Sequence, residues 1–136
     1  MTQMIKKHGG KMFAAGFLAG VVAFAVLAFT AQQSPRAPTR TIVLAARDIA
    51  FRLPDQPNHA NPALMLKKGE PVDLTIRNDE PGAVLHCFTI RGLNVKTARD
   101  LATGESETLM FTPQQKGTFA YACLMHPMMA GKVIVE

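Results

Sequence analysis

Apolar and polar residues alternate along much of the chain after residue 40. In PVDLTIRN, Val72, Leu74 and Ile76 fall on one face and polar residues on the other, which is the pattern of a half-buried β-strand. Similar runs recur, separated by turn signals such as NDEPG, ATGES and PQQKG. Strands are predicted over residues 41–51, 71–78, 85–90, 117–123 and 132–136, with another in ETLMFT. We therefore expect an all-β fold, a sandwich or Greek-key barrel.

A long segment rich in proline and asparagine, RLPDQPNHANPAL, interrupts this pattern over residues 52–64. A loop of this length is usually functional or mobile. It contains His59, which we interpret as a solvated loop histidine. An accessory or metal-acquiring ligand is the alternative interpretation of this residue.

The first thirty-one residues differ from the rest, because a basic start precedes the uncharged run 12–31. About twenty apolar residues suffice to span a bilayer, so we expect one N-terminal hydrophobic helix. A cleavable signal peptide has the same order of regions but a shorter apolar one, and Phe29 stands where a small cleavage-site residue is needed. We favour an uncleaved signal-anchor over a signal peptide, and over a helix buried in a soluble domain. Both membrane interpretations place the remainder outside the cytoplasm.

Residues 32–40, QQSPRAPTR, are polar and contain two prolines, so they predict an extended linker. Residues 41–136 then form one small domain. Three of the 15 basic residues precede the apolar run, which leaves 12 against 10 acidic residues, or +2. No basic run follows residue 40, and we expect no nucleic-acid binding.

The stretch YACLMHPMM gathers a thiol, an imidazole and three thioethers within nine residues. Cys123 lies on the same strand face as Tyr121, and His86 lies on the same strand face as Phe88. Both faces are expected to point inward, so the side chains of Cys123 and His86 are expected to meet. His126 follows three residues after the cysteine, and a methionine three residues later. Two His, one Cys and one Met are the donor set of a blue-copper site, in which thiolate favours Cu(I) and imidazole satisfies Cu(II).

The sequence YACLMHPMMAGKVIVE resembles the amicyanin/plastocyanin-like C-terminal copper loop of the cupredoxins, the type 1 blue copper protein family. Its short His-to-Met spacing is similar to that of amicyanin, whereas plastocyanin-type loops are longer there. The resemblance continues through GEPVDLTIRNDEPGAVLHCFTI and covers residues 41–136. It implies a cupredoxin-like Greek-key β-sandwich with one mononuclear type 1 copper per domain. The implied ligands are His86, Cys123, His126 and Met129. Met128 leaves the register ambiguous, and the family spacing favours Met129.

Cys87 departs from the family pattern, because cupredoxins commonly have asparagine after the first histidine ligand. The asparagine side chain ties the two ligand loops together, so this tether is in question here. Exported cysteine pairs usually form disulfides. Strand parity, however, directs Cys87 away from the face of His86 and so from Cys123. We therefore expect a metal-bound Cys123 rather than a disulfide between the two.

The resemblance implies an electron carrier rather than an enzyme, with His126 as the port for electrons. Its partner would be a redox protein such as a c-type cytochrome, an oxidase or a dehydrogenase. We expect a periplasmic or extracytoplasmic location, tethered to the membrane through residues 1–31. The alternative is a periplasmic copper carrier or chaperone that delivers copper to an oxidase. A metal-free, disulfide-closed sandwich that serves as an interaction module is the third possibility.

Overall fold

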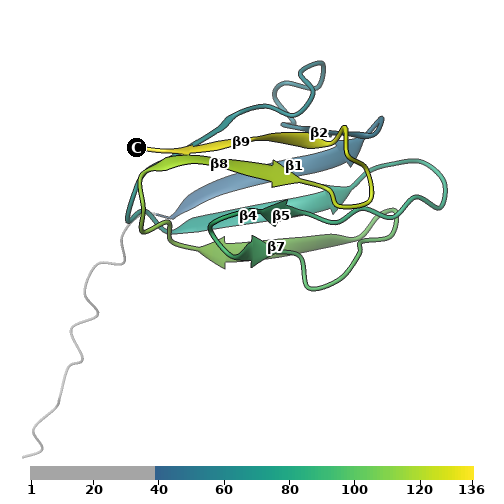
Figure 1. Ribbon diagram of the computed structural model, residues 1–136. Helices are drawn as coiled ribbons and strands as arrows, with labels where there is room; N and C mark the ends of the chain where they lie inside the picture. The colour runs from purple at the N-terminus through teal and green to yellow at the C-terminus, as the bar shows by residue number, and fades with distance from the viewer. Residues whose placement is uncertain (1–38) are drawn as a thin grey trace, which may run out of the picture. The chain divides into compact units, whose positions relative to one another are not determined.

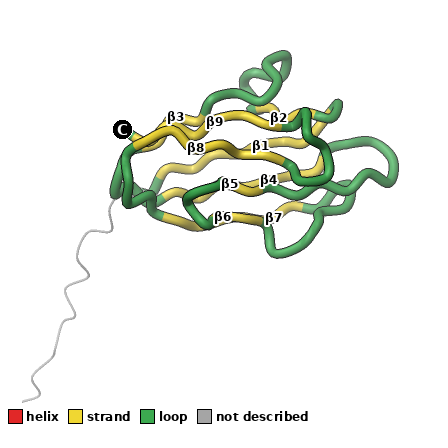
Figure 2. The backbone as a smooth tube through the Cα atoms, in the orientation of Figure 1, coloured by secondary structure: helices red, strands yellow, loops and turns green. Residues whose placement is uncertain are grey.

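Two β-sheets packed face to face make up residues 39–136, the part of the chain that the computed structural model describes (Figure 1 and Figure 2). Across these residues there is no helix of the length and apolar character that a membrane span needs. The hydrophobic helix expected over residues 12–31 and most of the linker expected over 32–40 lie outside the described residues. The all-β fold class is confirmed for the described part.

The first sheet has the strand order β2-β1-β4-β7 and the second the order β3-β9-β8-β5-β6. The first comprises β1 (Arg40–Arg47), β2 (Ala50–Arg52), β4 (Val72–Asn78) and β7 (Ser106–Phe111). The second comprises β3 (Leu64–Leu66), β5 (Thr89–Ile90), β6 (Val95–Lys96), β8 (Gly117–Ala122) and β9 (Ala130–Val135). Two neighbouring pairs, β1 with β4 and β3 with β9, are parallel. Because parallel partners cannot be joined by a tight turn, the chain crosses between the sheets and brings distant segments together at the ends of the sandwich.

The alternation predicted for β4 is confirmed, because Val72, Leu74 and Ile76 are buried while Arg77 is exposed. This strand lies between β1 and β7. Its inward-facing side chains therefore lie at the centre of one layer of the core. Burying each of these aliphatic side chains stabilises the fold by about 1.5–3 kcal/mol.

Three aromatic rings pack together in the core. Phe51 lies edge-on to Phe88 and Tyr121, with ring centroids 5.3 and 5.7 Å away, and the latter two rings stack at 5.4 Å. The hydroxyl of Tyr121 donates a hydrogen bond to the carbonyl of Pro62 at 2.8 Å. Opposite it in β9 is Gly131, where an added Cβ would come within 2.3 Å of the tyrosine ring. The position therefore has room only for glycine.

The single strand predicted over residues 41–51 is wrong, because the chain turns back at Asp48 and Ile49. Both residues have positive φ angles, 53° and 50°, and Arg47 pairs with Ala50 across the turn. Positive φ at both central positions is typical of the tight hairpin turns that match the twist of the two strands. The sequence Asp-Ile lacks the usual Asn-Gly signal for such a turn.

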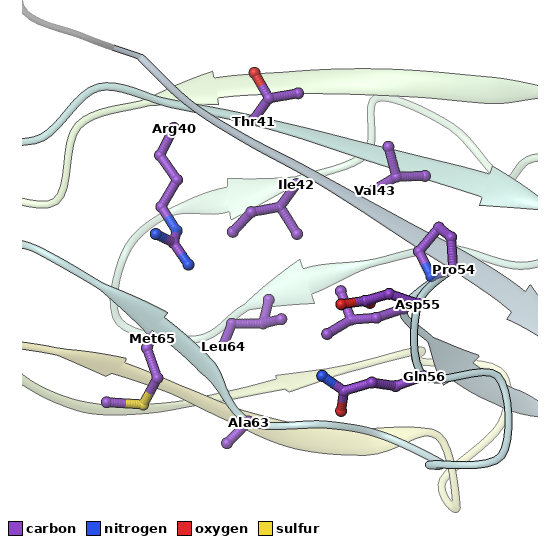
Figure 3. Close-up of a pocket in the computed structure, with 11 residues that line it drawn as sticks. Arg40, Thr41, Ile42, Val43, Pro54, Asp55, Gln56, Ala63, Leu64 and Met65 are labelled. Atoms are coloured by element: carbon purple, nitrogen blue, oxygen red, sulfur yellow. The ribbon is translucent and has the colours of Figure 1, made fainter.

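A groove of about 510 Å³ runs along one side of the sandwich (Figure 3). Residues 40–43 of β1 line one wall, residues 63–65 line the other, and Asp55 and Gln56 lie at one end. The strand β2 pairs only with residues 45–47 of β1, which leaves the first half of β1 open to the groove. The predicted metal ligands do not line it.

Candidate metal centre

Three of the four predicted ligands come together in the structure. The candidate ligand atoms of His86, Cys123 and His126 all lie within 4.8 Å of one another. The two imidazole rings have centroids 4.8 Å apart, and Sγ of Cys123 lies 3.6 Å from Nδ1 of His126. His86 and Cys123 are buried and His126 is half-buried. Two imidazoles and a thiol thus converge from segments 37 residues apart, before β5 and after β8.

The main chain and one buried amide fix the loop that carries His86. The N–H of His86 donates to the carbonyl of Leu101 at 3.1 Å, and its carbonyl accepts the Leu101 N–H at 2.7 Å. Asn78, buried at the end of β4, donates to the carbonyls of Val84 and Leu101 at 2.8 Å each. Its Oδ1 accepts the N–H of Glu80 at 3.0 Å. These bonds position the imidazole before any ligand binds.

A buried carboxylate faces the imidazole of His86. Oε2 of Glu80 lies 3.6 Å from Nε2 of His86 and accepts the N–H of Ile49 at 3.0 Å. Within residues 39–136, neither ring nitrogen of His86 has a hydrogen-bond partner. Because Nε2 faces the carboxylate, Nδ1 is the nitrogen left for a further partner.

The surroundings of His86 favour its neutral form. Burial is the main cause that lowers the pKa of His86, the nearby His126 adds to it, and Glu80 opposes it. A neutral imidazole retains the lone pair that metal coordination requires.

The loop from Cys123 to Met129 is closed by its own main chain. The N–H of Cys123 donates to the carbonyl of Met129, and the N–H of Met129 donates to the carbonyl of His126, both at 2.9 Å. This turn brings Cys123 and His126 to one point, as their spacing predicts. Of the face predicted to point inward from β8, Tyr121 and Cys123 are buried and Phe119 is half-buried.

Burial separates the two methionines that the sequence left ambiguous. Met129 is 0% exposed and Met128 is 68% exposed. The side-chain amide of Asn61 donates to the carbonyl of Met128 at 3.0 Å, and its Oδ1 accepts the N–H of Phe51 at 3.0 Å. The long loop over residues 53–63, between β2 and β3, therefore braces the 123–129 loop. Of the two methionines, only Met129 has its side chain inside the domain.

The prediction that Cys87 points away from Cys123 is wrong. Their Sγ atoms lie 3.7 Å apart, and both cysteines are buried and free. The N–H of Cys87 donates to Sγ of Cys123 at 3.5 Å. Strand parity fails here because regular pairing in β5 begins only at Thr89, so Cys87 lies in an irregular segment.

The thiol of Cys87 connects the two segments that carry the predicted ligands. Its Sγ accepts the N–H of Leu124 at 3.2 Å, so a side-chain tether exists although the asparagine common in cupredoxins is absent. Burial is the main cause that raises the pKa of the Cys87 thiol, and the hydrogen bond from Leu124 opposes it. A protonated thiol is a weak metal donor, which favours a supporting role for Cys87.

The residues present fit a copper ion. A buried nitrogen left without a partner costs about 1–3 kcal/mol, and a metal at Nδ1 of His86 would remove that cost. Two imidazoles, one cysteine sulfur and a buried thioether are the donors of type 1 copper. His59, the other histidine among the described residues, is exposed in the loop between β2 and β3 and lies outside the cluster.

Sequence reasoning missed the polar residues that support the cluster. Asn78, Glu80 and Asn61 lie outside the His/Cys/Met pattern that led to the site. An asparagine at the end of an apolar strand was the available signal for Asn78, because a polar residue on the inward face needs internal partners.

Exposed apolar side chains adjoin each of the four predicted ligands in sequence. Six large hydrophobic residues among those described are markedly exposed, and four of them adjoin the predicted ligands in sequence. These four are Leu85, Leu124, Met125 and Met128, which we call the apolar rim. Exposed apolar residues gathered in one place mark interaction sites more often than scattered ones do.

The fold and the donor set together define a β-sandwich protein with a mononuclear copper-type site. A family model described as the cupredoxin-like domain matches residues 20–135. The chain therefore belongs to the cupredoxin-like family. A search of curated protein sequences finds no match.

Three solved structures show the likeness in space. A copper-binding protein solved by NMR in its apo form is 25% identical, with 76% of this chain and 93% of that chain covered and a TM-score of 0.56. Auracyanin from Roseiflexus castenholzii is 19% identical, with 74% of this chain and 98% of that chain covered and a TM-score of 0.58. Rusticyanin is 22% identical, with 72% of this chain and 78% of that chain covered and a TM-score of 0.60. At these last two identities the likeness concerns the fold alone.

Proposed function

We propose that the protein is an exported type 1 copper protein that carries single electrons between redox partners, and not an enzyme. The observation that carries the proposal is the convergence of His86, Cys123 and His126 within 4.8 Å. With the buried Met129 they are the proposed ligands of one copper ion. The 25% identity to a copper-binding protein over most of both chains supports the same conclusion.

A bound copper would supply a one-electron couple between Cu(II) and Cu(I). The chain contributes a fixed arrangement of donors that suits both states. The hydrogen bonds of Asn78 hold the His86 loop, and those of Cys87 and Asn61 hold the 123–129 loop. Because these bonds exist without the metal, little rearrangement is needed when the charge of the site changes.

His126 is the proposed port for electrons. It is half-buried, whereas His86 is fully buried, so its ring is the nearer of the two to a docked partner. The apolar rim suits a small and transient contact, and methionine side chains adapt to differently shaped surfaces. A c-type cytochrome, an oxidase or a dehydrogenase would be a partner of this kind.

Export and membrane tethering are proposed from the sequence. The basic start followed by the uncharged run 12–31 supports a signal-anchor, with residues 32–40 as the linker. A tether would hold the domain near membrane-bound partners and so raise their effective concentration.

A copper carrier is the second candidate function, and the exposed thioethers of Met125 and Met128 favour it. Soft thioether donors select Cu(I), and exposed ones would be accessible to a receiving protein. The buried, pre-arranged histidines favour the electron carrier instead.

Titration of purified full-length protein with Cu(II) separates these functions. An electron carrier should bind one copper, become intensely blue, and lose and regain the colour on reversible reduction. A carrier of Cu(I) should bind copper in the presence of a reductant without developing a blue colour on oxidation. Absence of copper binding with both thiols reduced would reject both functions.

A further inference from the structure

Cys87 and Cys123 are held side by side by hydrogen bonds that do not involve a metal. Their sulfurs lie 3.7 Å apart, the N–H of Cys87 donates to Sγ of Cys123, and the N–H of Leu124 donates to Sγ of Cys87. An S–S bond is about 2.05 Å long, so the two sulfurs need to approach by roughly 1.7 Å, a distance within reach of side-chain rotation.

We propose that Cys87 and Cys123 are an oxidation site, at which the copper-free protein closes an intramolecular disulfide that excludes copper until it is reduced. Its effect on copper rests on the proposed function, because Cys123 is the proposed thiolate ligand. A sulfur in a disulfide has no thiolate to offer a metal. Copper and the disulfide are therefore alternative occupants of the same cysteine.

A low-molecular-weight disulfide is the class of oxidant that the step requires. Cys87, which is 9% exposed against 1% for Cys123, attacks one sulfur of the oxidant and displaces its first thiol. Cys123 then attacks the Cys87 sulfur in this mixed disulfide and displaces the second thiol. The protein loses two protons and two electrons, and the oxidant gains them as two thiols.

The supporting role of Cys87 does not by itself require a thiol. An oxygen acceptor at this position would also receive the N–H of Leu124, as the asparagine common in cupredoxins indicates. What a thiol adds is the ability to form a covalent bond with its neighbour. In an oxidising compartment, where such bonds persist, this difference acts directly on the copper site.

The test incubates copper-free, reduced, full-length protein with glutathione and glutathione disulfide at several ratios until the thiol content no longer changes. We expect the monomer to lose the mass of two hydrogen atoms and both alkylatable thiols. A proteolytic digest should contain Cys87 and Cys123 in one linked peptide pair. Copper uptake should be lost on oxidation and restored by a dithiol reductant, and protein loaded with copper beforehand should resist oxidation.

Two results would overturn the proposal: both thiols stay alkylatable at the most oxidising ratio, or the only products are glutathione adducts and intermolecular dimers. Cys87→Asn is the matched control, since it keeps an acceptor for Leu124 but cannot lose two hydrogens. If this variant does not fold, the peptide pair from the unmodified chain decides. Failure of the reduced protein to bind copper would overturn the proposed function and the competition with copper, while the thiol measurements still decide the disulfide.

Discussion

The carboxylate of Glu80 lies 3.6 Å from Nε2 of His86 and also accepts the N–H of Ile49 at 3.0 Å. One buried side chain therefore connects the turn between β1 and β2 with a proposed copper ligand. Ile49 has a φ of 50°, a conformation that is unfavourable for a β-branched residue. The bond to Glu80 stabilises this turn, and the same carboxylate lies beside the imidazole, where acidic residues stand behind metal-binding histidines.

Replacing Glu80 by glutamine should raise the reduction potential of the copper-loaded protein by roughly tens of millivolts. The variant removes a negative charge that favours the more highly charged Cu(II), while the amide oxygen can still accept the N–H of Ile49. Electrochemistry of the loaded protein measures the change. Asp79→Asn is the control, because Asp79 carries the same charge but pairs with Arg77 at 2.6 Å. Equal shifts in both variants would show an effect of net charge alone.

Cys123→Ser should abolish the blue absorption, because that band requires a copper–thiolate bond. Cys87→Ser should keep an intense band with a modest shift, since the serine hydroxyl can accept the N–H of Leu124 in place of the thiol. Visible absorption spectra of both variants, at matched copper content, make the comparison. A colourless Cys87→Ser protein beside a blue Cys123→Ser protein would reverse the assignment of the ligand.

Replacing Met129 by leucine should preserve the fold and the blue band and raise the reduction potential. The change nearly conserves volume at a fully buried position, which usually costs less than about 1.5 kcal/mol, and it removes a weak axial donor. Met128→Leu is the control on an exposed side chain and should alter the potential much less. A larger change in the Met128 variant would mean that the register of the loop is one residue off.

Pattern and spacing in the sequence predicted the all-β class, the inward row of β4 and the residues that converge at the cluster. They did not predict the strands β3 and β6, which have three and two residues and are too short to show a period. The hairpin at Asp48 and Ile49 was missed because Glu80, 31 residues away from Ile49, stabilises it. Parity misplaced Cys87 for a related reason, since alternation has no meaning where strand pairing has ended.

Gly131→Ala should destabilise the domain by about 1–3 kcal/mol through overpacking. The added methyl group would meet the ring of Tyr121 at 2.3 Å, and moving the ring would strain its hydrogen bond to Pro62. Urea unfolding of the copper-free protein measures the loss. Lys132→Ala, on an exposed neighbour in the same strand, should change the stability by less than about 0.5 kcal/mol. Equal effects of the two substitutions would show that the ring does not restrict position 131.

A single lysine in the apolar rim should slow electron exchange with a protein partner while leaving the copper site intact. Met125 and Met128 are exposed next to the half-buried His126. Met128 contacts Asn61 through its carbonyl, a bond that a lysine at this position retains. A charge placed there must lose its hydration when a partner covers the rim.

For Met125→Lys or Met128→Lys we expect a decrease of roughly one order of magnitude in the second-order rate constant, within the range that interface variants span. Stopped-flow reduction by a c-type cytochrome measures this rate, and a small inorganic reductant reports on the site alone. Met110→Lys is the matched control, because Met110 is 76% exposed and pairs with Asp73, near the end of β4 away from Asn78. Equal slowing with both reductants would mean that the lysine had damaged the site. Equal rates for rim and control variants with the cytochrome would reject His126 as the port and favour the copper carrier.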